Sequence, residues 1–499
     1  MASDSSILSL PGSRRLTSEI RSCARHLQLP DMHGPAIAKD TNYSLDVLGQ
    51  QPFLKMYTPI CLCFPVIDAS SRPAIIATLT NGLERLYASF PWLAGKVVNE
   101  GSGSGNTGIF KVKPSEEIPR LVVKDLRDDP SAPTMDALRR ANFPFSRLDE
   151  AIISPRKTLP GGADESTSNS APVFLVQANF ITGGLLLTFV GQHQTMDMTG
   201  EGQIIDLFSK ACRNEQFTSE ELTSGNLARH DLIPLLDDSY KPGPELAREI
   251  AKPPPSHPGS NSTDDQPTPP PPPKCTWTYF TFHPTALADL KSLATETITL
   301  PSGYISTDDA LSALVWQAVI RARLPRLNPT TEATFARAVD VRRYLDIPQT
   351  YPGLMLMMTY HTGTVEKLAE APLGAVASQL RSALDPKSSD LAYHTRALAT
   401  FMDRTPDKNT ISFLASLDLS ADFMLSSWSK LNIYELDFNL GLGKPEAVRR
   451  PRPVEFAGLA YLMPRSLEGE IALAICLRDE DIERLKGDEE FAKYGSFIG

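Results

Sequence analysis

A histidine and an aspartate stand four positions apart in the stretch GQHQTMDMTG, residues 191–200. The histidine, His193, carries an imidazole whose unperturbed pKa of about 6.5 suits general-base chemistry near neutral pH. The stretch follows an almost wholly apolar run at 184–192, which predicts a buried strand. A titratable pair at the end of a buried strand has three interpretations: half of a metal site, a hydrogen-bonded core pair, or a catalytic base with a supporting carboxylate.

Metal binding is the least supported of these interpretations. A stable zinc site needs three or four ligands, and a carboxylate such as that of Asp197 is a harder ligand than zinc prefers. No H-E-x-x-H motif is present, and the other histidines stand alone in unrelated contexts. We therefore predict no metal site, whereas the spacing alone leaves the core and the catalytic interpretations open.

Apolar periodicity predicts the elements that must position this pair. Strands are expected at 58–66, at both ends of 96–112, on either side of Gly183–Gly184 within 172–192, and at 277–282, 333–340, 456–465 and 469–477. Helices are expected at 72–90, 200–212, 306–323, 366–383, 389–402 and 480–494. Ser306 or Thr307 can cap the helix at 306–323, and Trp92 and Trp316 are expected in the core. The strands and helices mix without regular alternation, which favours two α/β domains with mixed sheets.

A proline-rich segment at 242–274 predicts the boundary between these domains. Twelve of its residues are proline, which fixes the backbone and removes a hydrogen-bond donor. The tract 267–273 is expected to form an extended polyproline helix. We therefore expect an N-terminal domain at 1–241, a crossover linker at 242–274 and a C-terminal domain at 275–499.

Composition excludes several classes of function. The 499 residues carry a formal net charge of -10, which argues against non-specific binding to nucleic acid or to an anionic membrane surface. No apolar run reaches the ~18 residues of a membrane helix, and LMLMM at 354–358 is far too short. The N-terminus has no signal-peptide core, so we expect a cytoplasmic protein. The six cysteines form no C-x-x-C pair and none has an evident base nearby, so neither a disulfide framework nor a cysteine nucleophile is expected.

Two motifs resemble those of the BAHD acyltransferases. His193 and Asp197 match the HxxxD motif of that family, and DFNLGLGKPEAVRRP at 437–451 matches its second, DFGWG-type motif. The resemblance is strongest to fungal members of the trichothecene 3-O-acetyltransferase type. Other stretches that look like this group, in the same order along the chain, are LGQQPFLKMYTPICLCFPV, FPWLAGKV, ISTDDALSALVWQ and AVDVRRYL. The ordered set is specific and favours the catalytic interpretation of His193.

The resemblance implies a fold and a reaction. The fold would be two similar-sized chloramphenicol-acetyltransferase-like α/β domains, with mixed sheets flanked by helices and an active-site channel between them. The reaction would be direct transfer of an acyl group, most simply from acetyl-CoA, to a hydroxyl of a fungal-type secondary metabolite, with His193 as general base. No cofactor would be permanently bound, and the partners would be acyl-CoA and a small alcohol acceptor, with the enzyme a monomer.

The resemblance also assigns supporting residues. Asp197 would point away from the substrates and pair with an arginine, for which Arg342 in DVRR is the candidate. Asp437 and Gly441 would hold the loop of the second motif. The basic residues nearest to that loop, candidates for binding the CoA phosphates, are Lys444, Arg449 and Arg450.

Two other functions remain open. Condensation-type domains of peptide synthetases carry HHxxxDG and use carrier-bound substrates, but Gln192 precedes His193 here, Met198 replaces the glycine, and no carrier domain is evident. A non-catalytic small-molecule-binding protein could have the same fold, although the intact histidine and aspartate argue against it. Asn439 and Leu440 replace the usual Gly-Trp of the second motif, so plant members give no guide to the acceptor.

Overall fold

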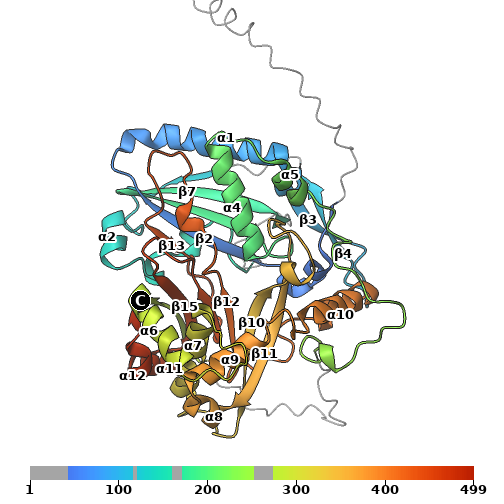
Figure 1. Ribbon diagram of the computed structural model, residues 1–499. Coiled ribbons are helices and arrows are strands. Elements are labelled where there is room, and N and C mark those ends of the chain that lie inside the picture. The colour runs from blue at the N-terminus through green and yellow to red at the C-terminus, as the bar shows by residue number, and fades with distance from the viewer. Residues whose placement is uncertain (1–42, 116–120, 160–170, 252–272) are drawn as a thin grey trace, which may run out of the picture. The chain divides into compact units, whose positions relative to one another are not determined.

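Three β-sheets organise the part of the chain that this computed structural model describes, residues 43–115, 121–159, 171–251 and 273–499 (Figure 1). Their strand orders are β13-β2-β8-β7-β5, β1-β4-β3-β6 and β11-β10-β12-β14-β15-β9-β16. The strands are Tyr43–Ser44 (β1), Tyr57–Pro65 (β2), Gly95–Glu100 (β3), Ile109–Pro114 (β4), Val122–Asp125 (β5), Ala171–Pro172 (β6), Phe174–Ile181 (β7), Gly184–Gln192 (β8), Cys275–Phe282 (β9), Glu332–Asp340 (β10), Leu356–Thr364 (β11), Phe423–Ser427 (β12), Ala447–Arg449 (β13), Leu459–Leu462 (β14), Ile471–Arg478 (β15) and Gly495–Phe497 (β16).

Helices flank the sheets. They are Arg72–Ser89 (α1), Met135–Arg140 (α2), Glu150–Ile153 (α3), Met198–Cys212 (α4), Ser219–Gly225 (α5), Pro284–Thr295 (α6), Thr307–Arg323 (α7), Val365–Glu370 (α8), Leu373–Ser382 (α9), Leu391–Arg404 (α10), Asp479–Lys486 (α11) and Glu489–Ala492 (α12). The prediction of two α/β domains with mixed sheets is confirmed. We call the domain of the five- and four-stranded sheets the N-terminal domain, and that of the seven-stranded sheet the C-terminal domain. No helix within the described ranges is long and apolar enough to cross a membrane.

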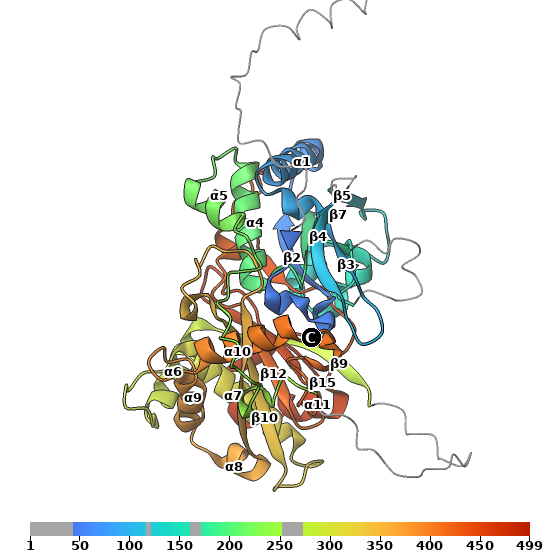
Figure 2. The same ribbon diagram turned by 90° about the vertical axis from the view of Figure 1, so that its right-hand side faces the viewer.

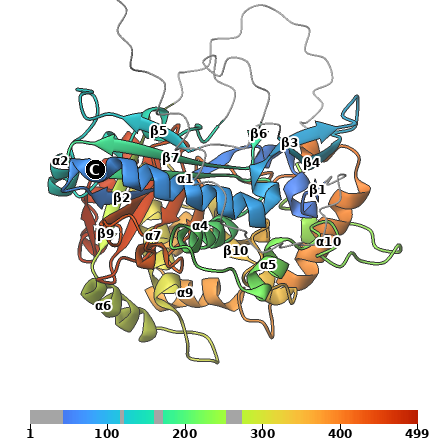
Figure 3. The ribbon, with the colours of Figure 1, turned by 90° about the horizontal axis from the view of Figure 1, so that it is seen from above.

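The strand that leads to His193 is central in the five-stranded sheet. Every residue of β8 is buried, and β8 pairs antiparallel with β2 on one side and β7 on the other. The hairpin between β7 and β8 turns at Gly183, whose φ of +77° favours glycine. The apolar residues of α1 and α4 pack onto this sheet in one core, and Figure 3 shows α1 running across β2 and β7. The end of β8 is therefore a rigid platform.

The C-terminal domain is built around α7, which is buried along nearly its whole length. Its start is set by a capping box, in which Ser306 and Asp309 exchange side-chain and backbone hydrogen bonds. Trp316 on this helix is fully buried, and Trp92 in the N-terminal domain is 2% exposed, so both are core residues as expected. In the seven-stranded sheet, β10 pairs antiparallel with β11 but parallel with β12, which makes the sheet mixed.

One strand passes from the second half of the sequence into the first sheet. β13 pairs antiparallel with β2, placing Ala447 opposite Cys63 and Arg449 opposite Cys61. Figure 1 shows β13 beside β2, although the strands are nearly 400 positions apart. The division at 242–274 stays a prediction, because residues 252–272, with most of the polyproline tract, lie outside the described residues.

Several predicted elements differ in detail. The helix expected at 366–383 is two helices, α8 and α9, because Ala371 before Pro372 has an extended backbone. The helix expected at 480–494 is divided into α11 and α12 at Gly487. β11 begins at Leu356, within the run at 354–358, and β16 lies along the edge of the large sheet. Periodicity predicted neither of these strands, nor β1, β5, β6, β12 and β13. Figure 2 shows the chain end beside β9.

Candidate active site

His193 lies in the turn between β8 and α4. Its backbone N–H donates a hydrogen bond to the carbonyl oxygen of Met56, 2.8 Å away, just before β2 begins. Four residues later Asp197 caps α4, with its Oδ1 accepting from the backbone N–H of Gly200 at 2.7 Å. The cap explains why the helix begins at Met198 rather than at residue 200. Together, the hydrogen bond to Met56 and this cap fix the turn at both of its ends.

The imidazole of His193 is oriented by a backbone carbonyl. Its Nδ1 lies 3.0 Å from the oxygen of Met196. A carbonyl oxygen can only accept, so Nδ1 carries the proton and Nε2 of the neutral ring keeps its lone pair. Burial lowers the pKa of His193, and the nearby charge of Arg450 adds to this, against the opposing contributions of Met196 and Asp197. The ring is therefore neutral near pH 7, with a basic Nε2.

His193 lines a cavity of about 360 Å³ whose walls come from both domains. Its wall is mostly apolar, so we call it the apolar cavity; the residues that define it include Phe53, Met56, Thr58, His193, Trp277, Met358, Phe413, Trp428, Arg450 and Tyr461. A second cavity of about 590 Å³ adjoins it and is lined by several charged residues; we call it the polar cavity, defined by Gln203, Asp308, Arg337, Asp340, Arg343, Arg381 and Lys430 among others. The two share a wall made by Asp197, Met198, Ala338, Leu356, Ser426 and Trp428.

Asp197 forms a buried ion pair with Arg342. Nη1 and Nη2 of Arg342 donate to the two carboxylate oxygens of Asp197 at 3.0 Å each. The backbone N–H of Met355 donates to the same carboxylate at 2.7 Å. Together with Gly200, these donors occupy both oxygens of a carboxylate that is 4% exposed. The structure thus brings together the two residues expected to pair, and the pair connects the N-terminal and C-terminal domains.

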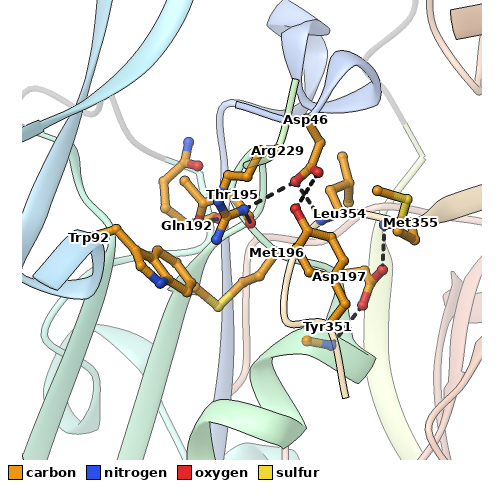
Figure 4. A network of polar contacts seen from close by, with 12 residues as sticks. Asp46, Trp92, Gln192, Thr195, Met196, Asp197, Arg229, Tyr351, Leu354 and Met355 are labelled. Atoms are coloured by element: carbon orange, nitrogen blue, oxygen red, sulfur yellow. Dashed lines mark hydrogen bonds and ion pairs between the residues drawn. The ribbon is translucent and has the colours of Figure 1, made fainter. Parts of the chain in front are cut away.

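A second buried ion pair lies beside the first and was missed from the sequence (Figure 4). Asp46, fully buried, accepts from Nη1 of Arg229 at 3.1 Å, from the hydroxyl of Tyr351 and from the backbone N–H of Leu354. The same Nη1 donates to the carbonyl oxygen of Thr195 at 2.7 Å, in the turn that follows His193. The feature of the sequence that could have indicated this ion pair was a single acidic residue, Asp46, within the apolar stretch LDVL.

Glu201 is a third buried acid at the site. Its Oε1 accepts from the backbone N–H of Gly191 at 3.1 Å, and its Oε2 contacts the hydroxyl of Thr58, a residue that lines the apolar cavity. Burial raises the pKa of Glu201 to about 8, so this carboxyl group is protonated near pH 7. Sequence reasoning assigned Glu201 only to a helix, and its position one turn inside α4 gave no signal of burial.

The second motif is anchored in the N-terminal core. Phe438 is fully buried and its ring lies 5.8 Å from the rings of both Phe189 and Phe208. Asp437 is exposed, and among the described residues its carboxylate accepts a hydrogen bond from the local backbone N–H of Asn439, at 2.8 Å, and from no other group. Gly441 has a φ of +72°, a conformation that favours glycine at this turn.

The three basic residues near this motif do not gather into one cluster. Lys444 is paired with Glu435 on the surface. Arg449 is 5% exposed, with its guanidinium 5.3 Å from the ring of Tyr279. Arg450 is 2% exposed and lines the apolar cavity, on the same wall as Trp428. The structure gives these residues three different surroundings.

Neither a metal-dependent reaction nor a cysteine nucleophile has much support in the described residues. Within them, no group of three or more histidine, cysteine or acidic residues could hold a metal ion. Burial raises the pKa of Cys212 and of Cys476 to about 12, which keeps both thiols protonated and poorly nucleophilic. The cavity next to a neutral, oriented imidazole is the arrangement best suited to removing a proton from a bound substrate.

Comparison with known proteins finds two family models and several similar proteins. One family model, described as "Trichothecene 3-O-acetyltransferase-like N-terminal domain", matches residues 56–212, and another, described as "Transferase family", matches residues 156–492. The O-acetyltransferase dmxR13 of Cryptosporiopsis sp. (strain 8999) is 61% identical over 469 residues, which cover 93% of this chain and 100% of that protein. Trichothecene 3-O-acetyltransferase TRI101 of Fusarium sporotrichioides is 52% identical over 456 residues, covering 91% and 97% of the two chains.

The tertiary structure is similar to a solved one. The crystal structure of F. sporotrichioides TRI101 complexed with coenzyme A and T-2 matches with a TM-score of 0.84 at 50% sequence identity. The match covers 92% of this chain and 100% of that chain. The similarity therefore extends over both domains.

Proposed function

The chain belongs to the Transferase family, and we propose that it transfers an acetyl group from acetyl-CoA to a hydroxyl of a small secondary metabolite. The observation that carries this proposal is the hydrogen bond from Nδ1 of His193 to Met196, which leaves a basic Nε2 on a ring that lines the apolar cavity. The membership itself makes the protein an acyltransferase. The identity of the base and the class of acceptor are the parts that we add.

His193 acts as the general base of a direct transfer. An alcohol is a poor nucleophile at neutral pH, and Nε2 accepts its proton as the oxygen attacks the carbonyl carbon of the thioester. The tetrahedral intermediate then collapses, the C–S bond breaks, and the proton held by His193 can pass to the leaving thiolate. No serine or cysteine of the chain has to be acylated in this sequence of steps.

The two cavities suit the two substrates. The phosphates of CoA are anionic, and the polar cavity carries four basic residues on its wall: Arg337, Arg343, Arg381 and Lys430. Arg337 is already paired with Asp308 and Asp309, and Arg381 lies 3.6 Å from Asp309, which leaves Arg343 and Lys430 as the better candidates. These residues replace Lys444 and Arg449 as our candidates for binding CoA. The apolar cavity, which His193 lines, suits the ring system of the acceptor.

The acceptor is proposed to be a polycyclic fungal alcohol. Two similar proteins are an O-acetyltransferase and a trichothecene 3-O-acetyltransferase, and one solved relative holds T-2 together with coenzyme A. A cavity of about 360 Å³ with aromatic walls can enclose a molecule of that size. We further propose that the protein is a cytoplasmic monomer, because one chain supplies the residues that line both cavities.

The direct test is an acetyl-transfer assay with a panel of alcohols. The protein is incubated with acetyl-CoA and each candidate, including trichothecene, other terpenoid and polyketide alcohols, while free thiol and acetylated product are both measured. Thiol release that requires an acceptor and matches product formation supports the proposal. Thiol release without any acceptor indicates a hydrolase instead.

A further inference from the structure

Arg229 lies outside the turn that carries His193 and holds one of the carbonyl groups of that turn. Its Nη1 donates to the carbonyl oxygen of the buried Thr195 at 2.7 Å, and among the described residues no other group donates to this oxygen. The same Nη1 donates to Oδ2 of Asp46 at 3.1 Å (Figure 4). The guanidinium carbon lies 4.1 Å from the centre of the Trp92 ring, which restricts its movement. A buried backbone carbonyl needs a donor, and Arg229 supplies it.

The carbonyl of Thr195 stands one peptide before the carbonyl that orients the imidazole. A peptide unit is planar, so the hydrogen bond from Arg229 fixes the plane that joins Thr195 to Met196. The next plane carries the Met196 oxygen, and its N–H, from Asp197, donates to a backbone carbonyl of the C-terminal domain at 3.5 Å, a weak hydrogen bond. The Met196 oxygen is the atom 3.0 Å from Nδ1 of His193. Arg229 therefore fixes the backbone from which the imidazole takes its orientation.

Arg229 is itself held by both domains. Its partner Asp46 follows β1 in the N-terminal domain and is fully buried. The carboxylate of Asp46 also accepts from the hydroxyl of Tyr351 at 2.5 Å and from the backbone N–H of Leu354 at 3.0 Å, both in the C-terminal domain. Because breaking a buried ion pair leaves an uncompensated charge, these contacts keep the guanidinium in one position while the two domains are packed together.

The first half of the turn is held by other contacts. The N–H and Oγ1 of Thr195 both donate to the carbonyl oxygen of Gln192, at 2.9 and 2.6 Å. Nε2 of Gln194 donates to the carbonyl oxygens of Gly49 and Gln51. Loss of the arginine should therefore free the peptide that follows Thr195 without releasing the first half of the turn from β8.

We propose that Arg229 is a positioning residue for the reaction: it holds the Thr195 carbonyl so that the Met196 carbonyl keeps the proton of His193 on Nδ1 and leaves Nε2 basic. This inference rests on the proposed function, in which His193 is the base. Arg229 lines neither the apolar nor the polar cavity, so it acts through the turn and not on the substrates. Support of this kind keeps a reacting group within the narrow range of positions that the reaction requires.

The first experiment measures kcat and KM separately in Arg229→Met. We expect kcat to fall by about 10–100-fold, because a small misplacement of a reacting group can cost about 100-fold in rate. The KM values for acetyl-CoA and for the acceptor should change little, since Arg229 contacts neither cavity. Arg229→Lys keeps a positive charge beside Asp46 but loses the planar guanidinium, so it should recover part of kcat. It also provides the test if Arg229→Met folds poorly.

Arg323→Met is the matched control. Arg323 is also buried, and its Nη1 donates to the backbone carbonyls of Ala421 and Asp422 at 2.7 and 2.9 Å, but it lines neither cavity. Its loss should lower the unfolding midpoint by a comparable amount and leave the kcat of the folded protein unchanged. If Arg229→Met keeps the wild-type kcat, or loses no more of it than Arg323→Met does, the inference is overturned.

The tautomer of His193 gives a readout that does not depend on activity. In protein that contains isotope-labelled histidine, the nitrogen chemical shifts of His193, assigned by comparison with His193→Gln, report which ring nitrogen carries the proton. Near pH 7, wild type and Arg323→Met should show the proton on Nδ1, and Arg229→Met a mixture of both tautomers.

This measurement separates the inference from the proposed function. A mixture of tautomers in Arg229→Met, together with a wild-type protein that acetylates nothing, would support the positioning of His193 by Arg229 and refute the transferase proposal. An unchanged tautomer in Arg229→Met, together with acetyl transfer that needs His193, would overturn the inference and leave the transferase proposal intact.

Discussion

The Nδ1 atom of His193 lies 3.0 Å from the carbonyl oxygen of Met196, and the two residues belong to the same turn. The tautomer of this imidazole is thus set by the backbone and not by a carboxylate. Asp197, the other residue of the motif, instead directs both carboxylate oxygens to Arg342 and to backbone N–H groups. The two residues of the motif are therefore expected to fail in different ways when substituted.

Replacing His193, the proposed base, should remove activity and leave the fold intact. For His193→Ala we expect kcat/KM with acetyl-CoA and a good acceptor to fall by about 10²–10⁴-fold, the usual contribution of a general base. The side chain is only half-buried and makes one hydrogen bond, so the unfolding midpoint should change little. His193→Gln provides a matched variant that is polar but not basic. Near-normal turnover by either variant would mean that another group accepts the proton.

The pH dependence of the reaction should report the lowered pKa of His193. Because burial and the charge of Arg450 lower that pKa below 6.5, kcat/KM should decline only as the pH falls below this value. Arg450→Met removes a nearby positive charge that disfavours the imidazolium, so its acidic limb should move to higher pH. The measurement is the pH profile of kcat/KM for both proteins. An acidic limb at the same pH in both would show that the two groups do not interact.

Asp197→Asn should lower stability as well as rate. The substitution leaves Arg342 buried, with Asp340 as its one remaining ion-pair partner among the described residues, and breaking a buried pair costs about 3–5 kcal/mol. Denaturant unfolding monitored together with activity tests this expectation. Asp340→Asn is the control, because that carboxylate is more exposed and its loss should cost less. A fully stable but inactive Asp197→Asn protein would instead make this aspartate a direct participant in the reaction.

Glu201 should make the protein less stable as the pH rises. Its pKa is raised from 4.5 to about 8 in the folded state, so between these values the unfolded chain releases a proton that the folded protein retains. Stability should fall with a slope approaching 1.4 kcal/mol per pH unit in this window. In Glu201→Gln, which is neutral at every pH, that part of the slope should disappear and stability at pH 8 should increase.

Unfolding free energies at pH 5 and pH 8 measure this difference. Glu366→Gln, at an exposed carboxylate, is the control and should leave the slope unchanged. A slope that is identical in wild type and Glu201→Gln would indicate that Glu201 is ionised in the folded protein.

The two first residues of the second motif should differ sharply in their contribution to stability. Phe438→Ala empties a position within an aromatic cluster and should cost about 3–5 kcal/mol. Asp437→Ala removes one local hydrogen bond at the surface and should cost about 1 kcal/mol or less. Denaturant midpoints of the two variants give the comparison. If Asp437→Ala proves the more damaging, this carboxylate has a partner beyond its own turn.

The pattern of neighbouring residues was sufficient to predict many helices and strands, but not all of them. The apolar run of β8 and the cap of α7 are written in adjacent residues, so their positions follow from burial and capping alone. The cap of α4 by Asp197 was not predicted, and that helix was expected to begin two residues later. β11 and β16 were missed because an edge or short strand gains its stability from a neighbouring strand, which no local window contains. The interruption of the helix at Pro372 was readable from the sequence, since the residue before a proline favours an extended backbone.

The sequence by itself determined the chemistry that is possible: one imidazole at the end of a buried strand, a carboxylate four residues later, and no serine or cysteine with an evident base. Only the tertiary structure decided how these groups act. Met196 sets the tautomer of His193, Arg342 pairs with Asp197 across the two domains, and Arg450 is buried beside the apolar cavity instead of joining a surface cluster. The physical reason is that protonation and hydrogen bonding depend on distances and burial between segments far apart in the chain, which residue types and spacing do not specify.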